Sequence, residues 1–374
     1  MDATINLDDY DTPEKVAKLG DIDPAFAKAL QAKPPLPLDL SDVPTLRKTV
    51  TWLEEEIAKR LPPLPPTVKQ TNITIPLRDG ASMDSILVYP TETAPTPGNG
   101  CPIVVLWHGG GCTIGSPLQV MPRARGLASL LSCAVLCPDY RLAPEHPFPT
   151  GVLDAWDSVL FASKGENFHA LGLNIDHGKG FIIGGLSAGG NFAGVLAQKA
   201  LEEGLTPPLT GQYLGWPSYF VDPANVPEKY RHLWFAYEQN ANDPTQTWQH
   251  VLHFLLKSTR IDKDSTLYSP MNPLTDGVQK HVGLPKAFVQ ASGMDSLRDD
   301  ALVYSRVLRD AGVDSWIQCY PGLPHVSEIF YAELTVSKQQ AGDTARGFAW
   351  MLGRRKGEWD EERADELMSI PVFS

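Results

Sequence analysis

The stretch "IIGGLSAGGN", residues 182–191, contains the pattern Gly-x-Ser-x-Gly centred on Ser187. The pattern follows an apolar run typical of a buried strand, and it precedes a helical stretch of small residues. A serine on a sharp strand-to-helix turn is exposed as a nucleophile, and Gly185 and Gly189 would avoid the clashes that side chains create there. Because the pattern also arises by chance, it predicts a nucleophile only in combination with other signals.

Short apolar runs alternate with helical stretches on both sides of this turn. The runs are "PIVVLW" at 102–107, "AVLCPD" at 134–139 and "GFIIGG" at 180–185, and helices are predicted over 120–132, 151–163 and 188–203. The alternation resumes with strands at 286–292 and 313–320 and helices at 298–311 and 335–353. Continuous apolar strands joined by crossover helices predict an α/β fold, with a mostly parallel sheet and helices on both faces.

The regions outside this alternation suggest one domain with an insertion. Apolar spacing predicts a helix over 43–61, and "TNITIPL" and "SMDSILVYP" around Asp79-Gly80 predict an antiparallel pair of strands. We expect N-terminal helices in 1–65, a core in 66–216 and 271–353, a mostly helical insertion in 217–270, and a charge-rich tail in 354–374 whose apolar end docks on the body.

Composition excludes several functions. The formal net charge of −12, without a basic cluster, argues against nucleic acid as a partner. The acidic N-terminus lacks a secretion signal and no apolar run is long enough to span a membrane, which predicts a cytoplasmic protein without stable membrane association. The five cysteines show no metal-ligand spacing, so we expect reduced thiols, no metal and no cofactor.

The segment "WHGGGC" at 107–112 is a rarer signal than the serine pattern. Glycines let the backbone approach a tetrahedral intermediate closely, so the amides of Gly110 and Gly111, together with that of Ala188, are predicted to form an oxyanion hole. His108 is expected to brace this loop, because the general base belongs on a later loop.

A serine nucleophile also needs a base and an orienting acid. The strand at 286–292 ends in "SGMDSLRDD", and the strand at 313–320 ends in "YPGLPHVSE". Functional side chains gather at the carboxyl ends of parallel strands, so Asp295 is the predicted acid and His325 the predicted base. Asp299, inside the following helix, is the alternative acid.

Together, these segments resemble the hormone-sensitive-lipase-like esterases of the α/β-hydrolase fold, the bacterial family IV type. The resemblance covers about 71–352 and also rests on "DYRLAPEHPFP" at 139–149 and "DSLRD" at 295–299. It implies an α/β-hydrolase fold, no cofactor, and a helical cap over the serine formed by 1–65 and 217–270. We expect a fungal member of this family. The chain departs from the family pattern at Leu186, Cys112 and Ser296, where the family usually has an acid, often an aromatic residue, and a proline.

The insertion that would form the cap is rich in aromatic residues. Nine lie between 216 and 254: Trp216, Tyr219, Phe220, Tyr230, Trp234, Phe235, Tyr237, Trp248 and Phe254. Some would pack the cap on the body, and others could line an apolar pocket. The predicted pocket residues are Cys112, Leu186, Trp216, Tyr219 and Phe220.

Three functions remain open from the sequence. The first is a serine carboxylester hydrolase acting through an acyl-enzyme on neutral, apolar acyl or aryl esters. The second uses the same triad on a natural product such as a polyketide, as an acyl hydrolase, thioesterase, acyltransferase or cyclase. The third is a non-catalytic small-molecule receptor. The expected partner is a small ester, and a homodimer is left open.

Overall fold

The computed structural model describes residues 4–35, 39–91, 100–220, 222–243, 254–272 and 279–370, and it contains one eight-stranded sheet. The strand order is β1-β2-β4-β3-β5-β6-β7-β8. β1 pairs antiparallel with β2, and β2 with β4, whereas every later pair is parallel. The strands are Val68–Pro76, Ser82–Pro90, Ile103–Trp107, Ala134–Pro138, Phe181–Leu186, Gly211–Gly215, Lys286–Ser292 and Ser315–Tyr320, numbered β1 to β8. The predicted α/β fold and antiparallel pair are confirmed.

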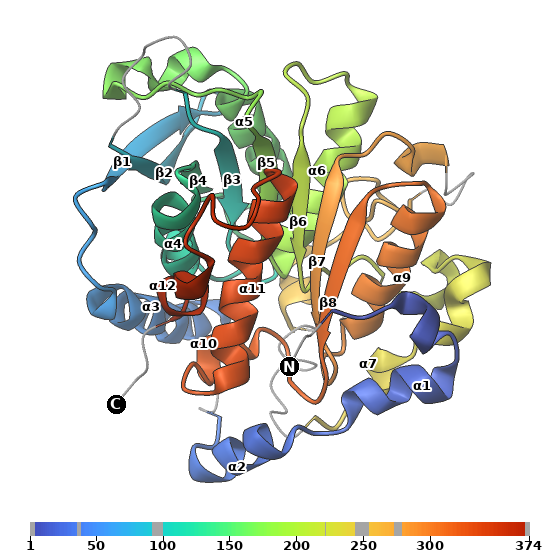
Figure 1. The fold of residues 1–374 in the computed structure, drawn as a ribbon. Helices are drawn as coiled ribbons and strands as arrows, with labels where there is room; N and C mark the ends of the chain where they lie inside the picture. Colours follow the sequence, from blue (N-terminus) through green and yellow to red (C-terminus); the bar gives the residue numbers. More distant parts are fainter. Residues whose placement is uncertain are drawn as a thin grey trace.

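Helices cover both faces of this sheet (Figure 1). One face carries α4 (Met121–Leu131), α11 (Thr335–Met351) and α12 (Ala364–Leu367). The other carries α5 (Thr150–Ala162), α6 (Ala188–Glu202) and α9 (Arg298–Asp310). Each face has its own apolar cluster, since the buried strands present side chains alternately to both sides.

The N-terminal helices lie along the lower side of the molecule in Figure 1. They are η1 (Leu7–Tyr10), α1 (Pro13–Ala17), η2 (Lys18–Gly20), α2 (Pro24–Ala32) and α3 (Val43–Arg60). The predicted helix over 43–61 is α3, and it begins where the Asp42 carboxylate accepts the amide of Thr45. Leu46 and Ile57 are buried on its inner side, as the spacing predicted.

The described part of the insertion contains only short helices, whereas the sequence predicted a mostly helical segment over 217–270. Its described part contains η5 (Pro223–Asn225), η6 (Glu228–Leu233), α7 (Ala236–Gln239) and helical residues 254–259. Prolines explain the difference before α7, because Pro217, Pro223 and Pro227 each remove a backbone donor. Trp248 lies outside the described residues. The remaining short helices are η3 (Pro117–Val120), η4 (Gly165–Leu171), η7 (Gln279–His281), α10 (Ser327–Phe330) and η8 (Glu361–Arg363).

The first described residues cover the β8 edge of the sheet. The amide of Ile5 donates to the carbonyl of Ile317 at 3.4 Å, and Trp316 Nε1 donates to Thr4 Oγ1 at 3.1 Å. Arg306 of α9 then donates to the carbonyl of Leu7 at 2.9 Å. The N-terminal segment therefore adds a short antiparallel contact beyond β8.

The tail docks on the body through its apolar end, as predicted. Met368 and Ile370 are buried, and a Cβ on Gly126 of α4 would lie 2.4 Å from Met368 Sδ. Val372 and Phe373 lie outside the described residues.

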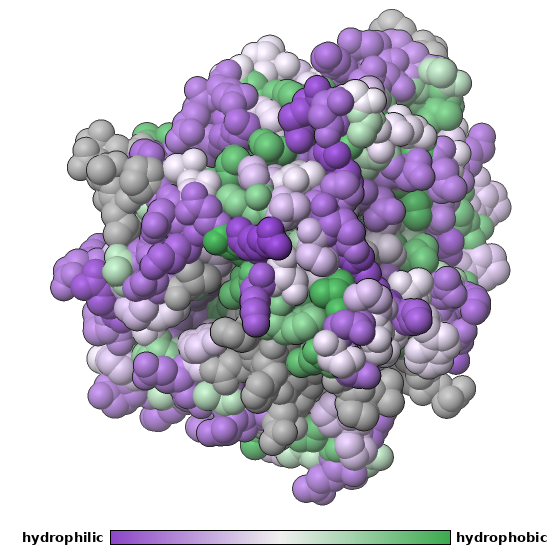
Figure 2. Space-filling view, turned by 180° about the vertical axis from the view of Figure 1, so that it is seen from behind, coloured by the Kyte–Doolittle hydropathy of each residue, from purple (hydrophilic) through white to green (hydrophobic). Residues whose placement is uncertain are grey.

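The next properties concern the surface, the cysteines and the helices of the described chain. Figure 2 shows hydrophobic residues scattered among hydrophilic ones on the face seen from behind. All five cysteines are free, as predicted. Of the helices in the described ranges, none is long and apolar enough to cross a membrane.

Candidate active site

Ser187 sits on a strained turn between β5 and α6. Its backbone has φ 53° and ψ −113°, a conformation that a side-chain-bearing residue rarely adopts. The turn is held in place because the Ser187 amide donates to the carbonyl of Gly215 at 2.7 Å, and the Asn191 amide donates to the carbonyl of Ser187 at 2.9 Å. Such a turn lifts a serine hydroxyl clear of the sheet.

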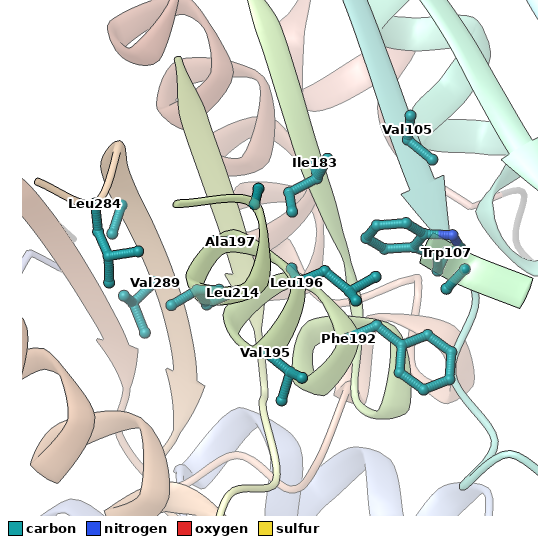
Figure 3. Packing of buried hydrophobic residues seen from close by; sticks show 14 of the residues in the cluster. Val105, Trp107, Ile183, Phe192, Val195, Leu196, Ala197, Leu214, Leu284 and Val289 are labelled. Carbon is teal, nitrogen blue, oxygen red and sulfur yellow. The ribbon is translucent and has the colours of Figure 1, made fainter. Parts of the chain in front are cut away.

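The glycines beside Ser187 are required by close backbone contacts. A Cβ on Gly185 would lie 2.5 Å from the carbonyl oxygen of Trp107, and a Cβ on Gly189 would lie 2.3 Å from the same oxygen. These are distances that real side chains do not adopt. The Trp107 ring packs edge-on against Phe192 of α6 (Figure 3), which holds the end of β3 against the start of that helix.

The glycine loop after β3 lies directly beside this turn. A Cβ on Gly109 would lie 3.2 Å from Ser187 Cβ. Gly110 has φ 105°, and its carbonyl accepts the amides of Thr113 and Ile114, both at 3.0 Å. Gln119 accepts the Gly109 amide at 2.6 Å. Among the described hydrogen bonds, none uses the backbone N–H of the predicted oxyanion donors Gly110, Gly111 and Ala188.

His108 is a bracing residue of this loop. Its ring stacks on Tyr140 with centroids 4.2 Å apart, and Tyr140 Oη donates to the His108 carbonyl at 3.0 Å. Burial lowers the pKa of His108 to about 4, so the ring is neutral at ordinary pH. The expectation that His108 supports the loop agrees with these contacts.

Asp295 and His325 form a buried pair on the loops that follow β7 and β8. His325 Nδ1 lies 2.6 Å from Asp295 Oδ2, and both side chains are 2% exposed. The other Asp295 oxygen accepts the amide of Leu297 at 2.9 Å. The two loops are joined by the amide of Met294, which donates to the carbonyl of Leu323 at 2.9 Å. Since β5, β7 and β8 are parallel, this pair and Ser187 lie at the same edge of the sheet.

Residues far away in the sequence hold these two loops. The Leu19 carbonyl accepts the amide of Gly322 at 2.8 Å, and a Cβ on Gly293 would lie 1.8 Å from the same oxygen. From the insertion, Asn240 Nδ2 donates to the carbonyl of Asp295 at 3.0 Å. The N-terminal segment and the insertion therefore both contact the loops that carry the acid and the histidine.

Asp299, the alternative acid, has other partners. It accepts the amides of Phe235 and Ala236 at 2.7 and 2.6 Å and pairs with the Arg298 guanidinium at 2.7 Å. His325 pairs with Asp295 instead. Asp299 therefore attaches the start of α7 to the body.

Asp300 fixes the insertion at a second point. It accepts the backbone amides of Tyr219 and Phe220 and the indole N–H of Trp234 at 2.7 Å. Burial raises the pKa of Asp300 to about 7, although these three donors favour the carboxylate. No sequence motif predicts that Asp300 anchors the insertion, and the sequence shows only that Asp299 and Asp300 are adjacent.

Helix α3 supplies two side chains that the sequence analysis missed. Arg47 donates through Nε to the carbonyl of Thr113 at 2.8 Å and through Nη2 to the carbonyl of Ala143. Glu54 accepts the Ser116 hydroxyl at 2.6 Å and the Ser116 amide at 3.2 Å. Burial raises the pKa of Glu54 to about 7. Both residues hold the chain just after the glycine loop, in contacts that only the folded chain reveals.

A pocket of about 580 Å³, counted with the space open to solvent, begins at Ser187. Its other lining residues come from the glycine loop, the 146–152 segment, α6 and the insertion: Gly111, Cys112, His146, Phe148, Gly151, Val152, Ala188, Asn191, Phe192, Ser218, Leu256, Thr259, Ile261, Leu267 and Tyr268. The "DYRLAPEHPFP" segment thus supplies part of the wall as well as supporting the glycine loop, since the Ala143 amide donates to the Cys112 carbonyl at 2.8 Å.

Of the five predicted pocket residues, only Cys112 lines this pocket, and the prediction for the other four is wrong. Leu186 is 1% exposed, in the same apolar cluster as the fully buried Trp216. Trp216 Nε1 donates to Ser292 Oγ, and Tyr219 Oη donates to the carbonyl of Gly190. Phe220 is buried against Trp234. These rings pack the insertion on the body, and the insertion's part of the described wall comes from Ser218 and residues 256–268 instead.

Comparisons with known proteins agree with this geometry. The profile of a family described as alpha/beta hydrolase fold matches residues 104–329. An AB hydrolase superfamily protein of Schizosaccharomyces pombe is 30% identical over 349 residues, covering 93% of this chain and 98% of that protein. Carboxylesterase NlhH of Mycobacterium tuberculosis is 32% identical over 274 residues, covering 72% of this chain and 78% of that protein.

Among solved structures, the crystal structure of vibralactone cyclase superposes with a TM-score of 0.78 at 26% identity, covering 90% of this chain and 96% of that chain. The strand order, the glycine loop and the serine turn agree with the family match. The chain belongs to the α/β-hydrolase family and is a carboxylesterase-type serine hydrolase of the hormone-sensitive-lipase-like group.

Proposed function

We propose that the chain hydrolyses neutral, apolar acyl or aryl esters through an acyl-enzyme on Ser187, with His325 as the base and Asp295 as the orienting acid. The observation that carries this proposal is the buried Asp295–His325 pair, 2.6 Å apart, at the sheet edge where Ser187 stands on its strained turn. We also propose that 1–65 and 217–270 form the cap over this site.

The residues divide the chemistry of the proposed cycle among them. His325 takes the Ser187 proton through Nε2 while Ser187 Oγ attacks the ester carbonyl, and the amides of Gly110, Gly111 and Ala188 bind the oxyanion. His325 then protonates the leaving alcohol and next activates a water that releases the acid. Asp295 holds Nδ1 and stabilises the imidazolium.

A fluorophosphonate probe followed by mass spectrometry tests this assignment. We expect one adduct on Ser187 in the wild type, no adduct in Ser187→Ala, and strongly slowed labelling in His325→Ala. Hydrolysis of p-nitrophenyl butyrate should fall in parallel with labelling. An adduct on another serine, or full hydrolysis by Ser187→Ala, would refute the triad.

A second candidate is acyl transfer within a natural-product intermediate, such as lactone formation. The structural similarity to vibralactone cyclase and the largely apolar pocket favour it. The same acyl-enzyme would be attacked by a hydroxyl of the substrate in place of water. Normal labelling of Ser187 without turnover of any simple ester would favour this candidate over hydrolysis.

A further inference from the structure

The pocket lies on one side of Ser187. Its described lining comes from the glycine loop, residues 146–152, the first turns of α6, Ser218 and residues 256–268. In the described chain, no lining residue comes from the loops after β7 and β8, which carry Asp295 and His325. The pocket therefore extends away from the histidine.

The position of the pocket relative to His325 indicates whether it holds the acyl part or the alcohol part of an ester. In the tetrahedral intermediate, the oxyanion faces the amide donors and the leaving oxygen faces His325, which must protonate it. The remaining substituent of the reacting carbon is the acyl chain, and it points away from the histidine. If the proposed triad is correct, the pocket holds the acyl group.

The lining of this pocket is mostly apolar but includes Ser218 and Tyr268, whose hydroxyl groups pair with each other. Ser218 Oγ and Tyr268 Oη lie 3.4 Å apart, and either can be the donor. Two hydroxyls that share one hydrogen bond leave one O–H and several lone pairs for a ligand. In the described part of the chain, neither hydroxyl makes another hydrogen bond.

Asn191 fixes the position of this pair. Its Nδ2 donates to the carbonyl of Ser218 at 2.5 Å and to the carbonyl of Tyr268 at 2.6 Å. Asn191 lies on α6, four residues after the N-cap residue Ser187, which is about 6 Å along the helix axis. Both hydroxyl-bearing residues are therefore attached to the helix that carries the nucleophile.

The other polar lining groups are less suited to binding an acyl chain. Thr259 Oγ1 donates to backbone carbonyls, to Gly111 at 2.9 Å or Leu255 at 2.8 Å. His146 is exposed to solvent. Burial raises the pKa of the Cys112 thiol to about 12, so it stays neutral and is a weak donor. Compared with these three side chains, the Ser218–Tyr268 pair thus has more hydrogen-bonding capacity left for an acyl oxygen.

We propose that the preferred substrate has an uncharged acyl group carrying a hydroxyl or keto oxygen, which hydrogen-bonds to Ser218 and Tyr268. This inference rests on the proposed function and deepens it. A purely aliphatic acyl group would leave the remaining hydrogen-bonding capacity of the pair unused, and this disfavours such substrates relative to an oxygenated acyl group.

Esters with one common leaving group test the proposal. The probes are p-nitrophenyl hexanoate and its hydroxy and keto derivatives, with the oxygen at carbons 3 to 6. For wild type we expect at least one oxygenated ester to exceed the hexanoate in kcat/KM by about tenfold. In the double variant Ser218→Ala/Tyr268→Phe this preference should disappear, so that the ratio of kcat/KM for the oxygenated ester to kcat/KM for the hexanoate falls to about one.

Tyr304→Phe is a matched control, because Tyr304 is fully buried and does not line the pocket. It should keep the wild-type preference. Equal rates for all probes in the wild type, or a preference that survives in the double variant, would overturn the proposal. Failure of the proposed function itself looks different, since Ser187 would then resist the fluorophosphonate and no probe would turn over. Labelling of Ser187 in the double variant verifies that it is folded.

Discussion

The serine turn and the loops on either side of it are held in different ways. The turn contacts the backbone of its own neighbouring strands, at Trp107 and Gly215. The glycine loop is held by side chains of α3, and the Asp295 and His325 loops by residues 19–23 and Asn240. The nucleophile is therefore held by close contacts with its own neighbouring strands, whereas the loops of its catalytic partners are held by distant segments, largely through polar contacts.

This difference has consequences for tolerance to substitution. A close contact between two backbone segments cannot adjust to an added atom, because the interior is close-packed and neither segment can move alone. A polar contact from a helix on the periphery can be lost while the loop retains its shape. Substitutions at the turn should thus lower the activity more than those on α3.

The largest expected effect tests which aspartate, Asp295 or Asp299, orients His325. In Asp295→Asn we expect kcat to fall by about 10⁴-fold, because the imidazole loses its orienting carboxylate. Asp299→Asn should retain most of the activity and lower the Tm, since Asp299 accepts amides of the insertion. Steady-state kinetics and thermal unfolding of both variants check this. A large loss of kcat in Asp299→Asn at unchanged Tm would reverse the assignment.

The next effect tests the steric half of the comparison. Gly189→Ala places a Cβ 2.3 Å from the Trp107 carbonyl oxygen, so the turn must shift. We expect kcat to fall by about a hundredfold and stability by about 1–3 kcal/mol. Gly165→Ala is the control, because its Cβ would meet no atom closer than 3.5 Å. Wild-type kinetics for Gly189→Ala would show that the turn is not sterically constrained.

A smaller effect is expected on the polar side. Arg47→Met removes the groups that donate to the carbonyls of Thr113 and Ala143, and it keeps a long, unbranched side chain at this position. We expect kcat to fall by about tenfold for every ester alike, because the loop of oxyanion donors serves all substrates. Lys59→Met, on the same helix and exposed, should behave as wild type. A loss confined to KM, or to one substrate, would argue that Arg47 acts on the pocket instead.

The smallest effect concerns pH. Burial raises the pKa of Glu54 from 4.5 to about 7, so the folded protein favours the protonated carboxyl group. The free energy of unfolding therefore decreases as the pH rises from about 4.5 towards 7, because Glu54 ionises more easily in the unfolded chain. Glu54→Gln removes this pH-dependent loss of stability, because glutamine does not ionise. The Tm of the variant relative to wild type should rise between pH 5 and 7 by a few degrees and then level off. Asp300 is present in both proteins, so its titration cancels, and a Tm difference that is constant with pH would contradict the assignment.

The sequence predicted the sheet, the major helices and the positions of Ser187, Asp295 and His325, because strand periodicity and glycine-rich turns are local signals. Arg47 and Glu54 could not be found in this way, since a charged residue on a helix reads as solvent-exposed until its distant partner is known. The aromatic part of the pocket wall was predicted at Trp216, Tyr219 and Phe220 instead of at residues 256–268 for a related reason. Aromatic residues such as Trp216 are enriched both in cores and in pockets, and composition does not separate the two.

The contact of Thr4 and Ile5 with β8 bears on the behaviour of the protein in solution. An exposed outer strand offers its unpaired backbone groups to any other extended chain, and this is a common route to aggregation. Here the chain shields that strand with its own N-terminal segment, secured by the hydrogen bond between Trp316 and Thr4. Another chain that paired with β8 at Ile317 and Gln318 would have to displace Thr4 and Ile5, so this contact opposes self-association through that part of the strand.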